Sequence, residues 1–356
     1  MLATATVTVD LGKITENTRT VVDALGWRAV VGVTKVTCGA PDVARAMLAG
    51  GATGIADSRV ENVARMRAAG IVTEFWSLRA PVPALADEVV RLIDVSLESE
   101  IEALHALDAA ARALGKRHRV VAMVDLGDLR EGMLAAELPA FVEAAEALPN
   151  IELHGIGTSL TCYGAIVPTA ENLGELIALT EAAERQVGRA LHISGGQSSA
   201  LDALEAGELP GRIDSLRIGE SILLGVSTVT REPILGLHTD AITVSAPVIE
   251  CMRKPSVPWG ESAQDAFAGR PTFVDRGDRV RAICAIGRQD TVPETLVPVD
   301  SRVEVLGASS DHLVLDVDAL PEPPRLGDAI TFVPGYSATL AAFTSPYVAK
   351  VFVGGQ

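Results

Sequence analysis

The chain of 356 residues is poor in cysteine and in closely spaced metal ligands. Its four cysteines, Cys38, Cys162, Cys251 and Cys284, include no C-x-x-C pair. This pattern indicates reduced thiols rather than a disulfide framework or a zinc site. Five histidines are too dispersed along the sequence to suggest a metal site by their spacing, so we expect no metal. They are His105, His118, His154, His192 and His238.

The sequence also lacks an apolar run long enough to cross a bilayer, because Asp23 and Arg28 interrupt its richest region. Its start, Met-Leu-Ala-Thr-Ala-Thr-Val-Thr-Val-Asp, has neither the basic segment nor the apolar core of a secretory signal. A hydrophobic content of 48% is nevertheless enough for a full core. Together with the cysteine pattern, these features predict a soluble, cytoplasmic protein that is neither exported nor membrane-bound.

Positive charge is scarce, with 30 Lys and Arg against 46 Asp and Glu and a formal net charge of −16. Such a balance repels phosphate backbones, and no basic block compensates for it. Nucleic acid is therefore excluded as an expected partner. The acidity could weakly attract a cationic substrate, although acidic surfaces usually serve solubility.

The chain does contain a regular alternation of strand-like and helix-like segments. Apolar strands alternating with helices predict a parallel sheet, and eight such units favour a closed barrel over an open sheet. We therefore predict an α/β fold with a (β/α)8 TIM-type barrel over residues 1–230. The strand-like segments are 28–34, 53–58, 74–80, 91–97, 119–126, 152–160, 190–195 and 215–224, and the helix-like ones include 42–49, 59–69, 98–114, 137–147 and 171–187.

Past about residue 230 the helical periodicity ends. Short strand-like pieces are separated by Pro, Gly and Asp, which is typical of a mostly β domain. We expect this second domain to span residues 231–356, and the total length fits two domains. Its strand-like pieces are 241–244, 281–286, 303–306 and 312–317.

Lys35 follows the apolar run 28–34 and precedes a Gly-Ala-Pro break, so it falls where a buried parallel strand leaves the sheet. Active sites of barrels occupy that rim. A partly desolvated lysine there favours the neutral amine, which attacks a carbonyl to form a Schiff base. The alternative is a lysine whose amine simply reaches solvent.

The segments after the last two expected strands supply a second signal. Ser194-Gly195-Gly196-Gln197-Ser198-Ser199 offers hydroxyl groups and close backbone approach, and Leu216-Arg217-Ile218-Gly219-Glu220-Ser221 adds a glycine at the same rim. Barrels often bind phosphate between these two loops. A glycine-rich turn needs no ligand, but combined with a rim lysine it points to pyridoxal 5'-phosphate (PLP).

With these motifs in order, the chain resembles the alanine racemase superfamily, the fold-type III PLP enzymes, and within it the branch of ornithine and broad-specificity amino-acid racemases. The resemblance covers nearly the whole chain. It rests on the Lys35 strand end, on segments 124–132 and 157–164, on the Ser-Gly-Gly-Gln-Ser-Ser loop and on 216–220.

The resemblance implies roles for particular residues. Lys35 would carry the cofactor and act as one of two proton-transfer bases, and Arg217 would sit against the pyridine nitrogen. A guanidinium has no acceptor and keeps its proton, so it would leave that nitrogen unprotonated and the ring a weaker electron sink. The remaining cofactor contacts would be Ser198 with the backbone of Gly219 and Glu220 at the phosphate, Tyr336 also at the phosphate, and Ser159 near the ring.

Substrate contacts follow in the same way. Arg130, in Asp125-x-Gly127-x-x-Arg130-x-Gly132, would take the substrate carboxylate with its planar fork. Ornithine and lysine are the substrates we expect from the branch. Their distal ammonium could meet Glu220, Asp128 or Glu131, although taken singly each of these is more often a solvated loop residue.

The second base is left open by the sequence. Relatives that are alanine racemases proper supply a tyrosine from the partner subunit's β domain in a Gly-Tyr-x-Asp turn, and the comparable stretch here reads Gly287-Arg288-Gln289-Asp290. Arginine is almost never a base. Asp311 and His312 are the candidates, since both can titrate near working pH if they are partly buried.

Three functional classes remain. The first is a PLP-dependent amino-acid racemase that acts as a homodimer with a shared active site. The second is a PLP lyase of the same fold, like D-threonine aldolase or D-serine dehydratase, which usually adds a metal that we do not expect. The third is a non-catalytic PLP-binding protein, against which the long second domain argues.

Overall fold

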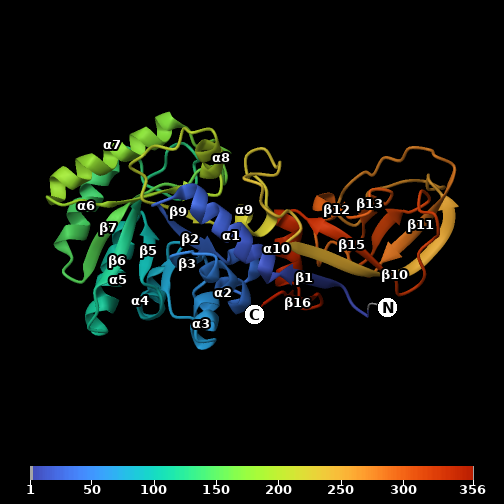
Figure 1. The fold of residues 1–356 in the computed structure, drawn as a ribbon, viewed down its shortest axis with the longest axis horizontal. Helices are drawn as coiled ribbons and strands as arrows, with labels where there is room; N and C mark the ends of the chain where they lie inside the picture. Colours follow the sequence, from blue (N-terminus) through green and yellow to red (C-terminus); the bar gives the residue numbers. More distant parts are fainter. Residues whose placement is uncertain (1–2, 356) are drawn as a thin grey trace. The chain divides into compact units, whose positions relative to one another are not determined.

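The computed structural model describes residues 3–355. The first two residues of the N-terminal segment quoted above, and the last residue of the expected second domain, lie outside them. The chain divides into two compact units, which we call the barrel unit, Leu11–Thr239, and the β unit, which joins the residues up to Asp10 to Asp240–Val353. Figure 1 labels the elements of both units along the sequence.

The barrel unit confirms the predicted (β/α)8 fold. Its eight strands close into a parallel barrel in sequence order, and β9 pairs with the first strand of the ring, β2. The strands are β2 Ala29–Val33, β3 Gly54–Asp57, β4 Glu74–Ser77, β5 Val95–Glu98, β6 His118–Met123, β7 Ile151–Gly157, β8 His192–Gln197 and β9 Ser215–Ile218.

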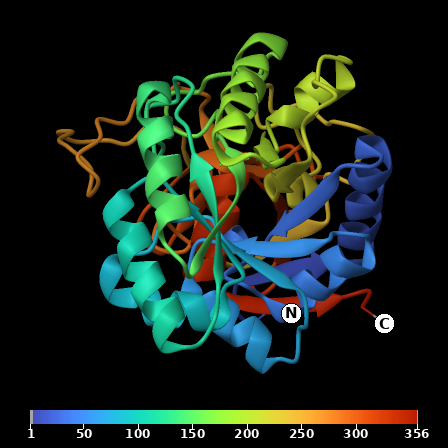
Figure 2. The ribbon, with the colours of Figure 1, turned by 90° about the vertical axis from the view of Figure 1, so that its left-hand side faces the viewer.

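Helices surround this ring of strands (Figure 2). They are α1 Leu11–Leu25, α2 Pro41–Ala49, α3 Val60–Ala68, α4 Ala86–Leu92, α5 Ile101–Ala113, α6 Leu138–Ala147, α7 Ala170–Val187, α8 Ala200–Glu205 and α9 Glu220–Leu224. Helix α1 shows why such segments form and pack: its buried residues Ile14, Thr18, Val21 and Leu25 recur at helical spacing and make one apolar stripe. The expected strand 215–224 ends at Ile218, because the chain turns into α9 after Gly219.

One side of the barrel interior is apolar. Val31, Ala56, Trp76, Val95, Leu97, Val121 and Met123 form a buried cluster contributed by β2 to β6. Branched and bulky side chains filling a barrel are what the fold requires, since the interior is a packed core and not a pore. Polar residues of β8 and β9, described below, occupy the other side.

The β unit is an eight-stranded sheet. The order along its path is β12-β15-β10-β11-β14-β13, and β1 pairs with β10 and with β16. The elements are β1 Thr6–Asp10, β10 Ile242–Pro255, β11 Asp278–Cys284, β12 Leu296–Pro298, β13 Glu304–Ala308, β14 Leu313–Asp316, β15 Ala329–Pro334, α10 Tyr336–Thr344 and β16 Ala349–Val353.

The first strand differs from the expected division of the chain at residue 230. β1 belongs to the β unit, where Val7 and Val9 are fully buried, and the barrel unit continues to Thr239. A five-residue strand does not reveal its partners in the sequence, because pairing with β10 and β16 spans most of the chain.

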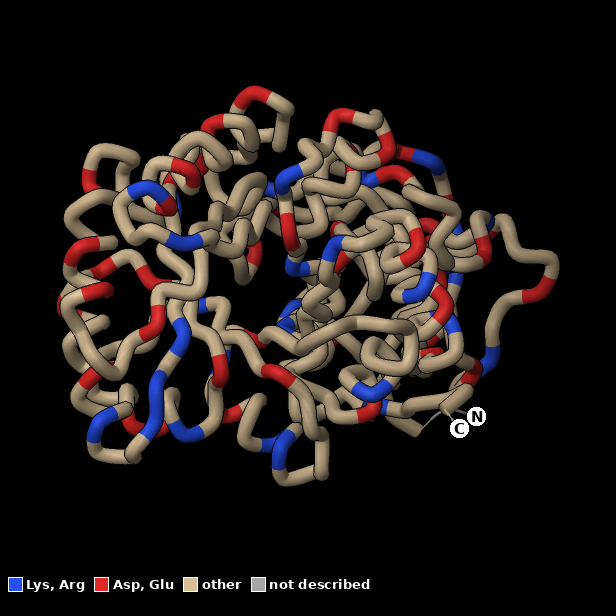
Figure 3. Tube along the Cα trace, turned by 60° about the vertical axis from the view of Figure 1, so that its left-hand side comes forward, with Lys and Arg blue, Asp and Glu red and all other residues tan. Residues whose placement is uncertain are grey.

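Three general expectations can be compared with the described residues. None of their helices is long and apolar enough to span a membrane. Lysine and arginine positions are scattered singly or in small groups along the trace among more numerous acidic ones (Figure 3). Within the described part of the chain no disulfide joins the four cysteines.

Candidate active site

Lys35 begins the 3₁₀ turn Lys35–Thr37 directly after β2, at the carboxyl-terminal rim of the barrel. The turn continues into Gly39, whose φ of +63° suits glycine and where a Cβ would lie 2.5 Å from the Cβ of Asn62. The rim position is the predicted one. The side chain is exposed, however, which corrects our expectation of a partly desolvated amine.

A buried carboxylate on the next strand fixes this turn. Asp57 ends β3, is 1% exposed, and accepts hydrogen bonds from Thr34 Oγ1 at 2.8 Å and Asn62 Nδ2 at 2.9 Å. Burial raises the pKa of Asp57, and these donors counter the effect. The residue before Lys35 is thereby tied to β3, so Asp57 helps to hold the backbone from which the lysine projects.

The hydroxyl of Ser198 lies between the carboxyl ends of β8 and β9. Its Oγ accepts the backbone N–H of Gly219 at 3.3 Å and of Ser221 at 3.4 Å. The neighbouring Ser199 is buried, and its Oγ has no hydrogen-bond partner among the described residues. Hydroxyl and backbone N–H donors gathered in this way fit a phosphate group.

Gly219 brings this loop close to the strand that carries the lysine. A Cβ at Gly219 would lie 2.8 Å from the Cβ of Val33, the last residue of β2, so a side chain there would push the two strand ends apart. The loop after β9 therefore meets the end of β2, and Ser198 lies one strand further around the rim, where its hydroxyl contacts Gly219.

Arg217 is buried in β9 and is held by neutral acceptors. Its Nη2 donates to the backbone oxygen of Thr158 at 2.7 Å and to Ser159 Oγ at 3.2 Å, and its Nη1 donates to Ser194 Oγ. Burial, with the positive charge of Arg130 adding to it, lowers the pKa of Arg217 to about 10. The guanidinium therefore stays protonated at neutral pH.

Arg130 lies in the loop after β6 and forms an ion pair with Glu131, Nη1 to Oε1 at 2.7 Å. Asp128 in the same loop is 1% exposed and has a different role from the one considered for it. Its carboxylate accepts the backbone N–H groups of Cys162 and Tyr163 in the loop after β7, at 3.0 to 3.2 Å. Asp128 is thus engaged by backbone donors and joins two rim loops.

Glu220 is the first residue of α9, and its carboxylate pairs with Arg231. Burial raises the pKa of Glu220, while the charges of Arg231 and of Lys35 oppose the increase. The carboxylate therefore lies close enough to Lys35 for their charges to interact. This proximity joins the loop after β9 to the lysine turn.

The candidates for the second base lie together in the β unit. Arg288 N donates to Ser309 O at 2.9 Å, which brings the Gly-Arg-Gln-Asp turn beside the loop that carries Asp311 and His312. The Nδ1 of His312 and Oδ1 of Asp311 are 2.7 Å apart. Both side chains are exposed, which corrects our expectation of partial burial, and the hydrogen bond to His312 lowers the pKa of Asp311. The arginine at the position of the usual tyrosine thus has a neighbouring His–Asp pair.

Tyr336 opens α10 in the β unit and is half-buried. Its expected contact with the cofactor phosphate stays a prediction. The same holds for the catalytic roles of Asp311 and His312.

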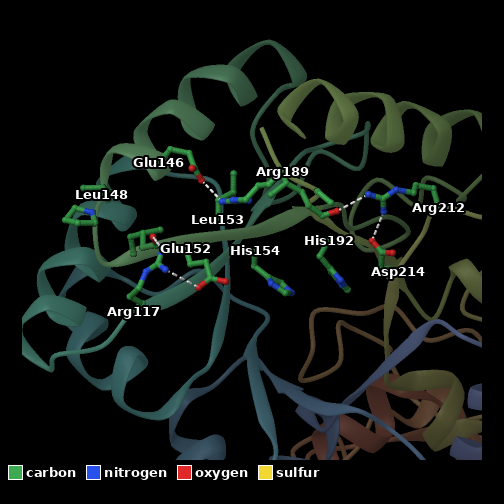
Figure 4. Close-up of a pocket in the computed structure, with 14 residues that line it drawn as sticks. Arg117, Glu146, Leu148, Glu152, Leu153, His154, Arg189, His192, Arg212 and Asp214 are labelled. Carbon is green, nitrogen blue, oxygen red and sulfur yellow. Dashed lines mark hydrogen bonds and ion pairs between the residues drawn. The ribbon is translucent and has the colours of Figure 1, made fainter. Parts of the chain in front are cut away.

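A pocket of about 820 Å³ opens at the opposite, amino-terminal end of the barrel strands (Figure 4). Arg117, Arg189 and Arg212 line it, and each is paired with a carboxylate. Two histidines that we treated as dispersed meet here: the rings of His154 and His192 stack with their centroids 4.9 Å apart. Across residues 3–355, no group of three or more His, Cys, Asp or Glu side chains could hold a metal ion.

Sequence reasoning missed several residues of the site. Ser194 and Ser199 lie inside the quoted Ser-Gly-Gly-Gln-Ser-Ser motif, yet only Ser198 was singled out. Asp57 also carried a signal, because it ends the expected strand 53–58 next to the strand of Lys35. Period-two alternation places Ser194, Ser215 and Arg217 on the same side of adjacent strands, and this could have identified the partners of Arg217.

Comparisons with known proteins give the family of this chain. The model of the alanine racemase N-terminal domain matches residues 9–227. The chain is 40% identical over 349 residues to an ornithine racemase of Acetoanaerobium sticklandii, which covers 97% of this chain and 98% of that protein. It is 41% identical over 347 residues to a lysine racemase of Thermotoga maritima, which covers 97% of each.

Solved structures share the fold. The alanine racemase from D-cycloserine producing Streptomyces lavendulae has a TM-score of 0.76 at 20% identity and covers 100% of this chain and 98% of its own. The alanine racemase from Bartonella henselae with covalently bound pyridoxal phosphate has a TM-score of 0.75 at 17% identity, with coverage of 99% and 100%. At these identities the likeness is one of fold.

Proposed function

Because this chain belongs to the alanine racemase family and is an amino-acid racemase, we propose that it interconverts the L and D forms of a diamino acid, ornithine or lysine, with PLP bound at Lys35. The observation that carries the substrate class is the identity of 40% and 41%, over almost the whole chain, to racemases of these two amino acids. The alanine racemases with the same fold are 20% and 17% identical to it.

The residues of the barrel rim fit the cofactor. Lys35 offers an amine for the aldehyde carbon, Ser198 and the backbone of Gly219 and Glu220 offer donors for the phosphate, and the unpartnered hydroxyl of Ser199 supplies another. When bound, PLP withdraws electrons from the substrate Cα and makes its proton acidic. The phosphate contact of Tyr336 and the ring contact of Ser159 belong to the same proposal.

Arg217 faces the ring nitrogen in this arrangement. Its guanidinium has no acceptor and stays protonated, so it donates a hydrogen bond without handing over a proton. A ring whose nitrogen stays unprotonated withdraws fewer electrons, which favours rapid return of the proton to Cα over elimination. Arg217 thereby favours racemisation.

Substrate binding divides between two ends of the amino acid. Arg130 takes the α-carboxylate, and Glu131 holds the arginine in position through their ion pair. Asp128 is already engaged by backbone N–H groups. Glu131 and Glu220 are therefore the carboxylates able to exchange an arginine partner for the distal ammonium.

Inversion requires a base on each face of the substrate. Lys35 serves one face. The pair of His312 and Asp311 serves the other, supplied by the second subunit of a homodimer as the family resemblance implies. The cysteine pattern supports a reducing cytoplasmic setting for this enzyme.

The proposal is tested by following optical rotation and Cα deuterium uptake from heavy water on a panel of amino acids that includes ornithine, lysine and alanine. We expect racemisation of ornithine or lysine to be fastest. Lys35→Ala should abolish both the activity and the absorption band of lysine-bound cofactor, whereas Lys116→Ala should preserve both. Lys116 is a matched control because its amine caps carbonyl groups at the amino-terminal end of the barrel. Exchange without inversion, or activity retained in Lys35→Ala, would contradict the proposal.

A further inference from the structure

A chain of polar side chains runs down the barrel interior beneath Arg217. Ser194 and Ser215 are 0% and 1% exposed, and they lie on β8 and β9 in register with each other. A Cβ at Gly157 would touch Val121, Met123 and Ser194, which places Ser194 against the interior cluster. Barrel interiors are usually filled with branched apolar residues, so buried hydroxyl groups here call for a reason.

The hydrogen bonds of this chain fix its direction. Ser215 Oγ donates to Ser194 Oγ at 3.4 Å, which uses the single proton of that hydroxyl. The Nε2 of His192 lies 2.7 Å from Ser215 Oγ, and with the serine proton on the side of Ser194 we assign this nitrogen as the donor. Burial, which lowers the pKa of His192 to about 4, keeps the ring neutral.

Ring packing holds His192 in place. Its ring stacks on that of His154 at an interplanar angle of 23°, and the ring of Trp76 lies 6.0 Å from each of them. Figure 4 shows the two imidazoles side by side on neighbouring strands. A side chain packed against two other rings is a rigid anchor for the hydroxyl groups above it.

Arg217 depends on this anchor more than most arginines would. Among the described residues no carboxylate forms an ion pair with it, and its two terminal nitrogens are held by different acceptors. Thr158 O and Ser159 Oγ both hold Nη2, and the bond from Nη1 to Ser194 fixes the other end of the planar fork.

We propose that His192, acting through Ser215 and Ser194, orients the guanidinium of Arg217 and is thus a positioning residue of the reaction. The inference rests on the proposed placement of Arg217 against the ring nitrogen of PLP. If the anchor is lost, Ser194 can rotate, the fork turns about its bond to Thr158, and its remaining N–H groups no longer point at one fixed atom.

The experiment reads the ring nitrogen directly in the holoenzyme. The enzyme is loaded with PLP carrying nitrogen-15 in its ring, and the resonance of that nitrogen is recorded for the wild type and five variants. In His192→Leu we expect the resonance to move toward the value of a pyridine without a hydrogen bond. We also expect kcat to fall about tenfold, as on losing an outer hydrogen-bond partner, with KM little changed. His192→Gln should restore both values, because its amide can donate to Ser215.

His118→Leu is the matched control. His118 is also a buried histidine with a pKa lowered to about 4 by burial, and its Nε2 lies 2.5 Å from Ser96 Oγ. Strand alternation points Ser96 away from the interior residues Val95 and Leu97. His118→Leu should therefore leave the resonance of the ring nitrogen unchanged.

Ser215→Ala decides the matter if His192→Leu does not fold, because it cuts the same chain by removing one hydroxyl. An unchanged resonance in Ser215→Ala or in folded His192→Leu overturns the inference. Arg217→Gln separates this result from a failure of the proposed function. If that variant also leaves the resonance unchanged, the placement of Arg217 is wrong, and the positioning role falls with it.

Discussion

The carboxylate of Asp128 accepts the backbone N–H of Cys162 through both of its oxygens, at 3.1 and 3.2 Å. Asp128 belongs to the loop after β6, which also carries Arg130. Cys162 belongs to the loop after β7, which also contains Ser159. One buried carboxylate therefore sets the spacing of two segments that face the same rim.

We expect Asp128→Ala to loosen the loop 161–166 and to reduce the free energy of unfolding by about 2 kcal/mol, as hydrogen bonds to a charged acceptor are lost. Amide hydrogen exchange should accelerate in that loop. Asp125→Ala is the control, because Asp125 accepts only N–H groups of its own turn, those of Gly127 and Leu129, among the bonds recorded for it. Unchanged exchange at Cys162 and Tyr163 would show that Asp128 does not hold the loop.

Ser198 should contribute to cofactor affinity. Ser198→Ala removes a hydroxyl next to the proposed phosphate, and we expect the dissociation constant of PLP to rise about tenfold, which corresponds to about 1.4 kcal/mol. Ser77→Ala is the matched variant, since Ser77 ends β4 at the same rim and donates to Arg79 O at 2.8 Å. Equal affinities of the two variants, measured by titrating the apoenzymes, would exclude Ser198 from the phosphate site.

The pH dependence of stability should carry a signature of His118. Burial lowers the pKa of His118 from 6.5 to about 4, so between these values the unfolded chain binds a proton that the folded chain does not. His118 therefore contributes about 3 kcal/mol to the free energy of unfolding above pH 6.5, and this contribution is lost as the pH falls toward 4. His118→Gln cannot titrate and should show a shallower decline in urea unfolding over this range. Parallel curves would contradict the assignment.

Glu98 should act in the opposite direction. Burial, with the charge of Glu131 second, raises its pKa from 4.5 to about 8, although the hydroxyl of Ser96 opposes the increase. The folded chain thus keeps a proton that the unfolded chain releases. Glu98 therefore contributes about 4 kcal/mol to the free energy of unfolding below pH 4.5, and this contribution is lost as the pH rises toward 8.

Glu98→Gln cannot ionise, so its stability should fall less than that of the wild type between pH 5 and 8. The slope is the quantity to compare, because the buried amide has a constant cost of its own. Glu102→Gln, at an exposed position of α5, should follow the wild type. If Glu98→Gln also follows it, the carboxyl group is ionised in the folded protein at lower pH than its burial implies.

The sequence was sufficient for the barrel and for the order of its motifs because both depend on local patterns. Each strand of the ring is a short apolar run followed by a helix, and Lys35 ends such a run. β1 could not be assigned in this way, since its partners β10 and β16 lie more than two hundred residues away. Pairing over such a separation leaves no local trace.

The site was predicted less completely than the fold. The residue type alone was enough to identify Lys35, Arg217 and Ser198 as candidates, because each has a distinctive chemistry at a strand end. The exposure of Lys35 and the engagement of Asp128 depend on which backbone groups surround them, and the sequence does not specify this. The stacking of His154 on His192 was missed because these residues lie on separate strands that only the closed barrel brings together.

The second base is the last element of the proposed reaction to be tested. The bond of His312 Nδ1 to Asp311 leaves Nε2 as the nitrogen able to move a proton, with Asp311 fixing the ring. His312→Asn should slow inversion about a hundredfold, the usual size of a general-base contribution. Asp311→Asn should slow it less, because the imidazole remains.

The loss should affect only one face of the substrate. In heavy water, Lys35 still exchanges the Cα proton of one enantiomer, so His312→Asn should incorporate deuterium into that enantiomer without inverting it. His105→Asn, at an exposed position of α5, should behave as the wild type in both measurements. If inversion and exchange slow together in His312→Asn, the histidine acts by structure. If neither slows, the base on the face opposite Lys35 is another residue. In that case His312 does not take over the role of the tyrosine whose position Arg288 occupies.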